Sequence, residues 1–308
     1  MNTDTSRTTA ADARPHRGTI FQETGEILAH HDAGAGQWIL RVHAPQCARA
    51  AGPGQFAHLQ CAPELPMRRP LSIMRVDREA GWVEFLYKVV GRGTRALSQQ
   101  AVGDRISVLG PIGQPFRLNP ERPQRLLLGG GVGIPPMIFL ADQLHRRGAA
   151  GSTRAVLGSE VPFPFHARPS EILWPGLPDG AIGTLPLLED WGIACRLTSK
   201  AGLPGAHDGF VTDLARIWLR ELEAAQRAQV ELFACGPHPM LAACAELAAE
   251  FELPCQVSLE EFMACAVGGC AGCTVPVRTP DGVAMKRVCV DGPVFAAADV
   301  FPEPALAR

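Results

Sequence analysis

The sequence predicts a protein of three parts: an antiparallel β-barrel, an α/β domain built on a parallel sheet, and a small C-terminal module. Residues 18–118 contain short strand-like stretches interrupted by glycine and proline, a pattern typical of antiparallel barrels. In residues 119–254 strand-like and helical stretches alternate, which is typical of an open parallel sheet. Residues 255–308 carry four closely spaced cysteines. Residues 1–17 are almost without apolar side chains, and we expect them to form a disordered tail.

The bulk composition excludes several classes of protein. The chain has 308 residues, 46% of them hydrophobic and 19% charged, which fits a globular protein of two domains and a small module. Its net charge of −2 argues against nucleic acid or an anionic membrane surface as the main partner. No apolar run reaches the roughly eighteen residues of a membrane-spanning helix. Six cysteines outside the C-terminal module are scattered in mostly apolar settings, as reduced thiols usually are, so we expect a cytoplasmic location.

The barrel strands are expected at short intervals, at Trp38–Val42, Gln55–Gln60, Leu71–Arg75, Trp82–Val89 and Asp104–Leu109. Two segments among them could bind an anionic ligand. Arg69 stands beside a proline-fixed strand and could hold a phosphate. Gly91 and Gly93 let backbone N–H groups turn toward an anion at a helix that begins near Thr94. Taken alone, the first segment could equally be an edge strand and the second a hairpin turn that leads into a helix.

The α/β region contains two segments suited to a dinucleotide. Strands are expected at Arg125–Leu128, Arg154–Leu157, Ile193–Leu197 and Val230–Ala234, and helices at Met137–Arg147, Thr212–Gln226 and Pro239–Phe251. The first strand runs into a glycine-rich turn with a proline pair, which favours phosphate binding although it departs from the strict G-x-G-x-x-G pattern. The last strand ends in small residues, Cys235 and Gly236, where ligands sit in open α/β sheets. A turn without ligand and a buried structural thiol are the alternatives.

The C-terminal cysteines follow the pattern C-x4-C-x2-C-x15-C, and they are Cys265, Cys270, Cys273 and Cys289. The first three match the loop that surrounds a [2Fe–2S] cluster in plant-type ferredoxins, and thiolates are the soft ligands that such a cluster takes. The glycines Gly268, Gly269 and Gly272 would let the backbone curl around it. A structural zinc site is the alternative, but zinc ribbons favour two C-x2-C pairs and this chain has one.

Taken in order, these segments resemble the ferredoxin-reductase superfamily, in which a flavin-binding β-barrel precedes a nicotinamide-binding α/β domain. The stretch LEEFMACAVGGCAGCTV together with KRVCVDGPVF resembles the electron-transfer subunits of NAD-linked dihydroorotate dehydrogenases, often called the PyrK type. The resemblance covers nearly the whole chain after residue 18. Two features depart from the family pattern: the last cysteine interval is slightly longer than expected, and the stretch Gly158–Ser170 matches no known role.

The resemblance implies residues for three cofactors. FAD would be bound by residues of two strands and one helix start: Arg69, Pro70, Leu71, Ser72, Leu86, Tyr87, Lys88, Gly93 and Thr94. Among these, Ser72 would lie close to the isoalloxazine, and Gly93 and Thr94 would hold the pyrophosphate. NAD would be bound by Gly130, Gly131, Gly133, Cys235 and Gly236, with Cys235 and Gly236 nearest the nicotinamide. The four cysteines would hold the cluster as its metal ligands.

The resemblance also implies the function. Electrons would pass from the flavin of a partner dehydrogenase through the [2Fe–2S] cluster and FAD to NAD⁺, in the dihydroorotate oxidation of pyrimidine biosynthesis. The chain has no segment left for substrate chemistry, so we expect no catalytic residues in it and a catalytic, FMN-containing partner in a hetero-oligomer. NADP remains open, since Arg196 and Lys200 could contact a 2′-phosphate. An oxygenase-type reductase and a non-catalytic redox or zinc-binding regulator are the alternative functions.

Overall fold

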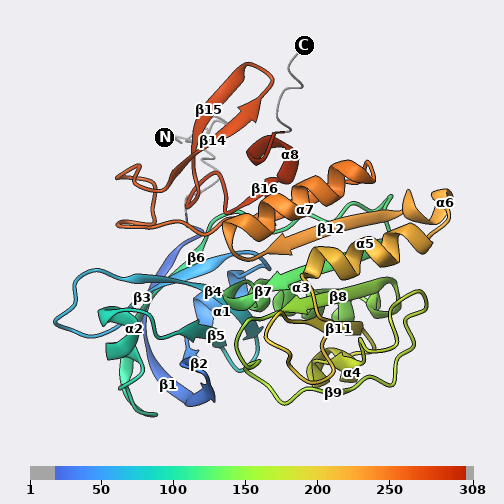
Figure 1. Cartoon of the computed structure of the whole chain (residues 1–308). Coiled ribbons are helices and arrows are strands. Elements are labelled where there is room, and N and C mark those ends of the chain that lie inside the picture. The colour runs from blue at the N-terminus through green and yellow to red at the C-terminus, as the bar shows by residue number, and fades with distance from the viewer. Residues whose placement is uncertain (1–17, 303–308) are drawn as a thin grey trace, which may run out of the picture.

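A computed structural model describes residues 18–302, and the predicted disordered tail, residues 1–17, lies outside the described residues. Its first part is a closed six-stranded barrel with the strand order β1-β2-β5-β4-β3-β6 (Figure 1). The barrel elements are β1 (Phe21–Gly34), β2 (Gln37–His43), α1 (Pro45–Ala50), β3 (Phe56–Gln60), β4 (Arg69–Asp77), β5 (Trp82–Lys88), α2 (Arg92–Leu97) and β6 (Arg105–Ile112). The predicted antiparallel barrel is confirmed, and each of its neighbouring strand pairs is antiparallel.

The first strand, β1, was not predicted although it is the longest in the barrel. Only Gly25 and Ile27 of its fourteen residues are buried. A strand that buries so few side chains lacks the apolar alternation by which strands are recognised in a sequence. Its pairing with β2 and β6 closes the barrel and therefore depends on the tertiary fold.

Strand β4 changes its neighbour halfway along its length. Residues 69–72 pair with β3, whereas Ile73 and the residues after it pair with β5. The pairing of β4 with β5 ends at Ile73 and Phe85, while β5 continues to Lys88 beside β2. The first half of β4 and the last three residues of β5 therefore diverge, and their facing backbone edges are not paired with each other.

The second part is a six-stranded sheet with the order β11-β8-β7-β12-β13-β16. Five strands are parallel: β7 (Gln124–Gly130), β8 (Thr153–Gly158), β11 (Ala194–Thr198), β12 (Val230–Cys235) and β13 (Cys255–Ser258). The sixth, β16 (Val294–Ala296), is antiparallel to β13, so the sheet is mixed rather than wholly parallel.

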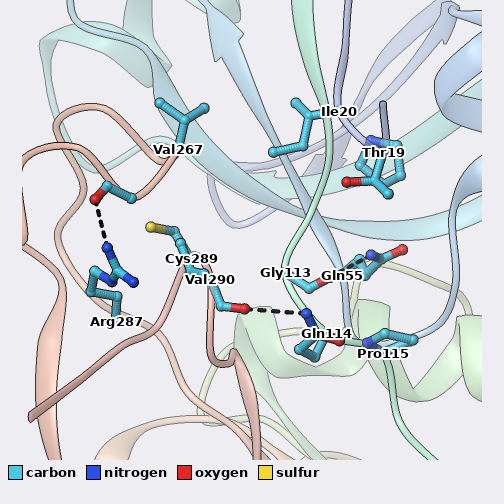
Figure 2. A pocket seen from close by; sticks show the side chains of 12 residues that line it. Thr19, Ile20, Gln55, Gly113, Gln114, Pro115, Val267, Arg287, Cys289 and Val290 are labelled. Atoms are coloured by element: carbon cyan, nitrogen blue, oxygen red, sulfur yellow. Dashed lines mark hydrogen bonds between the residues drawn. The ribbon is translucent and has the colours of Figure 1, made fainter. Parts of the chain in front are cut away.

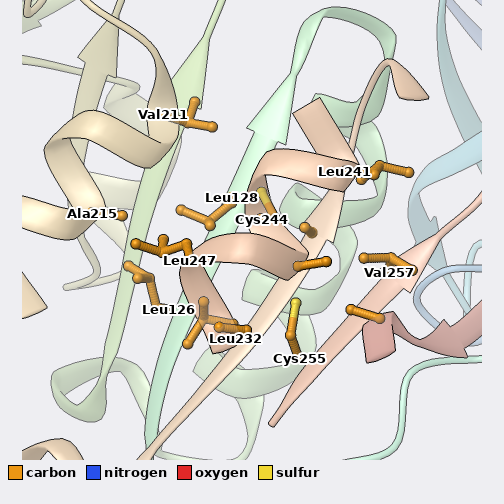
Figure 3. Close-up of a cluster of buried hydrophobic side chains, with 14 of the residues drawn as sticks. Leu126, Leu128, Val211, Ala215, Leu232, Leu241, Cys244, Leu247, Cys255 and Val257 are labelled. Carbon is orange, nitrogen blue, oxygen red and sulfur yellow. The ribbon is translucent and has the colours of Figure 1, made fainter. Parts of the chain in front are cut away.

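Helices cover both faces of this sheet. The helices α5 (Val211–Glu221) and α7 (His238–Glu250) pack on one face, where Leu126 and Leu232 of the sheet meet Ala215 and Leu247 of the helices (Figure 3). On the other face α3 (Ile134–Arg146) contacts both β7 and the barrel strand β4. The helix predicted at Thr212–Gln226 is divided, because Leu222 has extended backbone angles between α5 and α6 (Ala224–Arg227).

The remaining elements of this part are short. They are η2 (Gly131–Gly133), η3 (Ala150–Ser152), β9 (Arg168–Pro169), β10 (Gly183–Thr184) and α4 (Pro186–Asp190). The unassigned stretch 158–170 leads from β8 to β9 and contacts the barrel, since Gln37 Nε2 donates a hydrogen bond of 2.8 Å to the Pro162 carbonyl. In this protein the stretch therefore joins the two larger parts.

The cysteine module lies between β13 and β16, the two outermost strands at one edge of the sheet. It contains the cysteine loop, the hairpin β14 (Thr274–Thr279) and β15 (Gly282–Arg287), and is followed by α8 (Ala297–Val300) (Figure 1). The sheet thus extends beyond residue 254, where we expected the module to begin. Within residues 18–302, no helix has the length and apolar character needed to cross a membrane.

Candidate functional site

Arg69 and the start of α2, two of the predicted phosphate-binding features, lie against each other. A Cβ atom added to Gly93 would lie 2.5 Å from Arg69 Nε, so only glycine lets the guanidinium come this close. Arg69 Nη1 donates to the carbonyl oxygens of Met67 and Arg68, at 2.8 and 3.0 Å. Thr94 Oγ1 accepts the backbone N–H of Val90 at 3.0 Å and shapes the same turn. The fold therefore brings a positive charge beside a glycine turn.

The predicted flavin-lining residues lie where β4 and β5 diverge, but they do not share one exposed face. Leu71 and Tyr87 are buried in the barrel core, where Tyr87 Oη and His30 Nε2 are 2.8 Å apart. Leu86 points the other way and packs with the residues of α3. Ser72 and Lys88 are half-buried. A ligand at this place would meet the backbone of β4 and β5 together with the side chains of Ser72 and Lys88.

The two predicted dinucleotide segments are in contact at the carboxyl ends of β7 and β12. These strands are neighbours, with Gly129 opposite Cys235. A Cβ atom on Gly133 would lie 2.1 Å from the Cys235 carbonyl oxygen. On Gly130 or Gly236 it would lie 2.4 or 2.6 Å from Met240 Sδ. Glycine at position 133 is therefore required for the close approach of the two loops, whereas at Gly130 and Gly236 an added Cβ atom would meet the flexible side chain of Met240.

Cys235 is protonated at neutral pH. Its side chain is buried, and burial together with the nearby Glu260 carboxylate raises the pKa of the thiol to about 12. A neutral thiol is a poor nucleophile. Cys235 can therefore border a ligand but is not suited to form a covalent intermediate.

The two residues considered for a 2′-phosphate are engaged elsewhere. Arg196 is buried and donates to the carbonyl oxygens of Cys195 and Ile172, at 2.7 and 2.8 Å. Lys200 forms an ion pair of 3.3 Å with Asp208. The sequence does not reveal these partners. The structure argues against a contact between Arg196 and a 2′-phosphate, because the side chain is buried and its guanidinium is held by backbone carbonyls.

The four cysteines of the C-terminal module form two pairs. The sulfurs of Cys273 and Cys289 are 3.4 Å apart, and both side chains are buried. Cys265 and Cys270 form the second pair, in which the Cys270 backbone N–H lies 3.4 Å from the Cys265 sulfur and the two side chains also interact. Cys270 is exposed. Across residues 18–302, no three side chains of His, Cys, Asp or Glu gather around one point as a single metal ion would need.

The loop that carries the first three cysteines turns at more positions than its glycines. Gly268 has a φ of 82°, and Ala266 and Ala271 also have positive φ, of 57° and 52°. The sequence predicts this freedom at Gly268, Gly269 and Gly272, but of these only Gly268 has a positive φ. Backbone strain at two alanines is typical of a loop shaped around a ligand.

Backbone N–H groups of this loop point at its first sulfur. Although burial raises the pKa of Cys265, hydrogen bonds from Val267, Cys270 and Gly269 outweigh it and lower the pKa to about 7. Such bonds stabilise a thiolate, the form that binds metal. At Cys289, burial and the neighbouring Cys273 raise the pKa to about 12. All four potential metal ligands are thus sulfur atoms, and backbone N–H groups favour the anionic thiolate form of Cys265.

A pocket of about 310 Å³ separates the cysteine loop from the barrel (Figure 2). Val267, Arg287 and Cys289 line one side, and Gln55 and Gly113 line the other. The sequence interpretation missed Gln55 and Gly113. The only available signal was the run Gly110–Pro115, in which Gly113 has a φ of 90° and packs against Pro293.

Comparison with known proteins gives consistent results. Residues 260–301 match the iron-sulfur cluster binding domain of dihydroorotate dehydrogenase B. The chain is 32% identical over 280 residues to a protein of Desulforamulus reducens, covering 90% of this chain and 97% of the relative. It is 36% identical over 254 residues to one of Bacillus caldolyticus, covering 80% and 86%. Both relatives are named as the electron transfer subunit of dihydroorotate dehydrogenase B (NAD(+)).

Solved structures agree on the fold. A chain of the NADH-dependent reduced ferredoxin-NADP oxidoreductase aligns with a TM-score of 0.72 at 28% identity, covering 90% of each chain. The ferredoxin reductase of carbazole 1,9a-dioxygenase aligns with a TM-score of 0.59 at 22% identity, covering 76% of this chain and 67% of that one. The second likeness, to an oxygenase-type reductase, concerns the fold alone.

Proposed function

This chain belongs to the family of electron transfer subunits of NAD-dependent dihydroorotate dehydrogenase B, and from that premise we propose how its residues divide the work. The four cysteines hold a [2Fe–2S] cluster, the barrel holds FAD and the α/β domain holds NAD(H). An FMN-containing partner subunit oxidises dihydroorotate, and the two form a hetero-oligomer. The observation that carries the proposal is the pairing of the four sulfurs beside a pocket that faces the barrel.

The sulfur pairs support a two-iron cluster over a single zinc ion. Two thiolates on one tetrahedral metal with bonds near 2.3 Å lie about 3.7 Å apart. The sulfurs of Cys273 and Cys289 are 3.4 Å apart, and Cys265 with Cys270 provides the second pair. A [2Fe–2S] cluster takes four cysteines, two on each iron, whereas structural zinc takes four around one centre. The donor set therefore fits the cluster.

The barrel residues fit FAD in two places. Arg69 beside the Gly93 turn is suited to the pyrophosphate, because a guanidinium binds phosphate oxygens through charge-assisted hydrogen bonds. The diverging edges of β4 and β5 offer unpaired backbone groups to a polar ring, and the Ser72 hydroxyl lies at the same place. When bound, FAD would supply the exchange between one-electron and two-electron transfer that joins the cluster to a nicotinamide.

The α/β domain is suited to hold NAD(H) at the contact between its two glycine loops. Gly133 lets the loops that follow β7 and β12 come close together, and beside them Gly131 has nothing within 4 Å of an added Cβ atom, so a ligand could approach the backbone there. The protonated Cys235 borders this place without competing as a nucleophile. With Arg196 engaged by backbone carbonyls, the site has one cation fewer for a 2′-phosphate, which favours NAD over NADP.

The partner subunit is expected to dock over the cysteine loop. Phe262 is 93% exposed and Val267 is 51% exposed, on either side of the first cysteine. Exposed apolar side chains that cluster at one place mark interaction surfaces. A cluster accepts electrons from another protein only at short range, so the loop segment that carries the exposed residues Phe262 and Cys270 is where a second redox centre would approach. The cytoplasmic location remains a prediction.

The proposal is tested by cofactor analysis of the purified full chain, reconstituted anaerobically. We expect iron, sulfide and FAD to be bound, NADH to reduce an artificial acceptor, and dihydroorotate to be oxidised only after the partner is added. Cys270→Ser should lose most of the iron and sulfide, whereas Cys244→Ala on α7 should keep both. Bound zinc without sulfide, or substantial dihydroorotate oxidation by the chain alone, would contradict the proposal.

A further inference from the structure

Arg287 connects the two halves of the cysteine site. From the end of β15 its Nη1 donates a hydrogen bond of 2.9 Å to the carbonyl of Gly268, in the loop between the first two cysteines (Figure 2). Its backbone N–H donates to Asp291 Oδ2 at 2.8 Å, and its carbonyl accepts the N–H groups of Val290 and Asp291. The side chain therefore holds the ligand loop, while the backbone of the same residue holds the turn that carries Cys289.

The carbonyl that Arg287 binds belongs to a peptide that also faces a sulfur. The Gly268 carbonyl and the Gly269 N–H form one peptide unit, and that N–H is among the backbone groups that lower the pKa of Cys265. The N–H of Gly268 itself partly offsets the raised pKa of Cys289. Hydrogen bonds arranged in a chain polarise one another, so a guanidinium at the carbonyl strengthens the donation from the N–H at the other end.

The orientation of this peptide is fixed by packing. Gly268 has a φ of 82°, and a Cβ atom there would lie 2.6 Å from Val290 Cγ2. Arg287 Nη1 would lie 3.5 Å from the same atom, so the guanidinium and Val290 close over the glycine from the side of the pocket. Val290, the neighbour of the fourth cysteine, thus leaves room only for glycine at this position, and the Arg287 hydrogen bond holds the Gly268 carbonyl.

From these contacts, and on the basis of the proposed [2Fe–2S] site, we propose that Arg287 is a positioning residue that raises the reduction potential of the cluster. Reduction adds a negative charge, which is favoured by hydrogen bonds to the sulfurs and by a nearby cation. Arg287 supplies both, through the Gly268–Gly269 peptide and through its own charge. Asp291 Oδ2 lies 3.8 Å from Arg287 Nε and offsets part of the charge.

The test is a redox titration of the cluster in the full reconstituted chain, followed by the paramagnetic signal of its reduced form. Arg287→Gln removes the charge and the donor fork, Arg287→Lys keeps the charge, and Arg278→Gln makes the same charge change at the far end of the hairpin, where Arg278 is exposed. Iron, sulfide and FAD are measured in each variant, so that a shift in potential is read only from protein with an intact site.

We expect Arg287→Gln to lower the potential by at least about 59 mV, a tenfold change in a one-electron equilibrium, while Arg278→Gln stays at the wild-type value. Arg287→Lys should fall between the two. An unchanged potential in Arg287→Gln with iron retained would overturn the inference. If Arg287→Gln does not keep its iron, a wild-type potential in Arg287→Lys would overturn it instead. A wild-type chain without any cluster signal would refute the proposed function itself.

Discussion

Gly133→Ala is the sharpest perturbation of the proposed nicotinamide site. The added Cβ atom would lie 2.1 Å from the Cys235 carbonyl oxygen and 2.3 Å from its carbon. Both atoms belong to backbone, so no side chain can rotate to make room. Real Cβ atoms approach no closer than about 3.0 Å, and the two loops must therefore separate by about 1 Å.

The cost follows from that displacement. Inserting a methyl group into a packed site destabilises a protein by about 1–3 kcal/mol. For domains of 150–250 residues, each kcal/mol corresponds to about 2–4 °C in Tm. We therefore expect Gly133→Ala to lower the free energy of unfolding by about 1–3 kcal/mol. A misplacement of about 1 Å at a binding site costs about a hundredfold in function, so NAD(H) affinity should fall by at least tenfold.

Two measurements and one control variant separate local from general effects. Denaturant unfolding gives stability, and titration of the FAD-loaded chain with NAD⁺ gives affinity. Gly151→Ala is the matched control, because Gly151 lies in the same domain, in η3, with nothing within 4 Å of an added Cβ atom. It should keep wild-type affinity and stability or become slightly more stable. Wild-type NAD⁺ affinity in Gly133→Ala would refute the argument that the contact of the two loops forms the site.

Two further predictions concern the barrel and the partner. Burial, with Arg68 nearby, lowers the pKa of His58 to about 4. Between about pH 6.5 and pH 4 the unfolded chain therefore binds a proton that the folded chain does not, and the free energy of unfolding decreases as the pH is lowered. In His58→Leu this loss, at most about 3 kcal/mol, should disappear from denaturant unfolding curves compared at about pH 7 and about pH 5, and an unaltered pH dependence would contradict the assignment. Phe262→Ser should weaken partner binding by at least tenfold in a pull-down or titration without loss of iron, while Val102→Ser, at an exposed residue of the barrel, should not. Equal affinity of the Phe262→Ser and wild-type chains would exclude Phe262 from the docking face.

The regular elements with clear periodicity could be predicted from the sequence, and those defined by tertiary pairing could not. Strands β7, β8, β11 and β12 are short apolar runs, and each was expected within one or two residues of its observed bounds. Strand β16 has only three residues, none of them buried, and it exists because Ser258 and Gln256 of β13 offer it an edge. A strand that depends on its neighbour carries no pattern of its own.

The candidate site divides in the same way. Glycine and cysteine motifs predicted which segments would meet, because close approach and sulfur ligation each require particular residue types. They could not predict that Tyr87 turns into the barrel core toward His30, or that Arg196 is held by carbonyls. Both outcomes depend on which face of the strand the side chain lies on, and a register shift of one residue would move the side chain to the other face.

The position of the cysteine module follows from how it leaves and re-enters the sheet. Val257 of β13 pairs with Phe295 of β16, and the Leu259 N–H donates to the Pro293 carbonyl at 2.9 Å. The module is thus a loop closed at its base, rather than a domain on a flexible tether. On its barrel side, the Gln114 N–H donates to the Gly292 carbonyl at 2.6 Å. Both places hold Cys289 at the pocket through contacts within this chain, so we expect the fold of this chain to set the distance between a cluster held there and a flavin in the barrel.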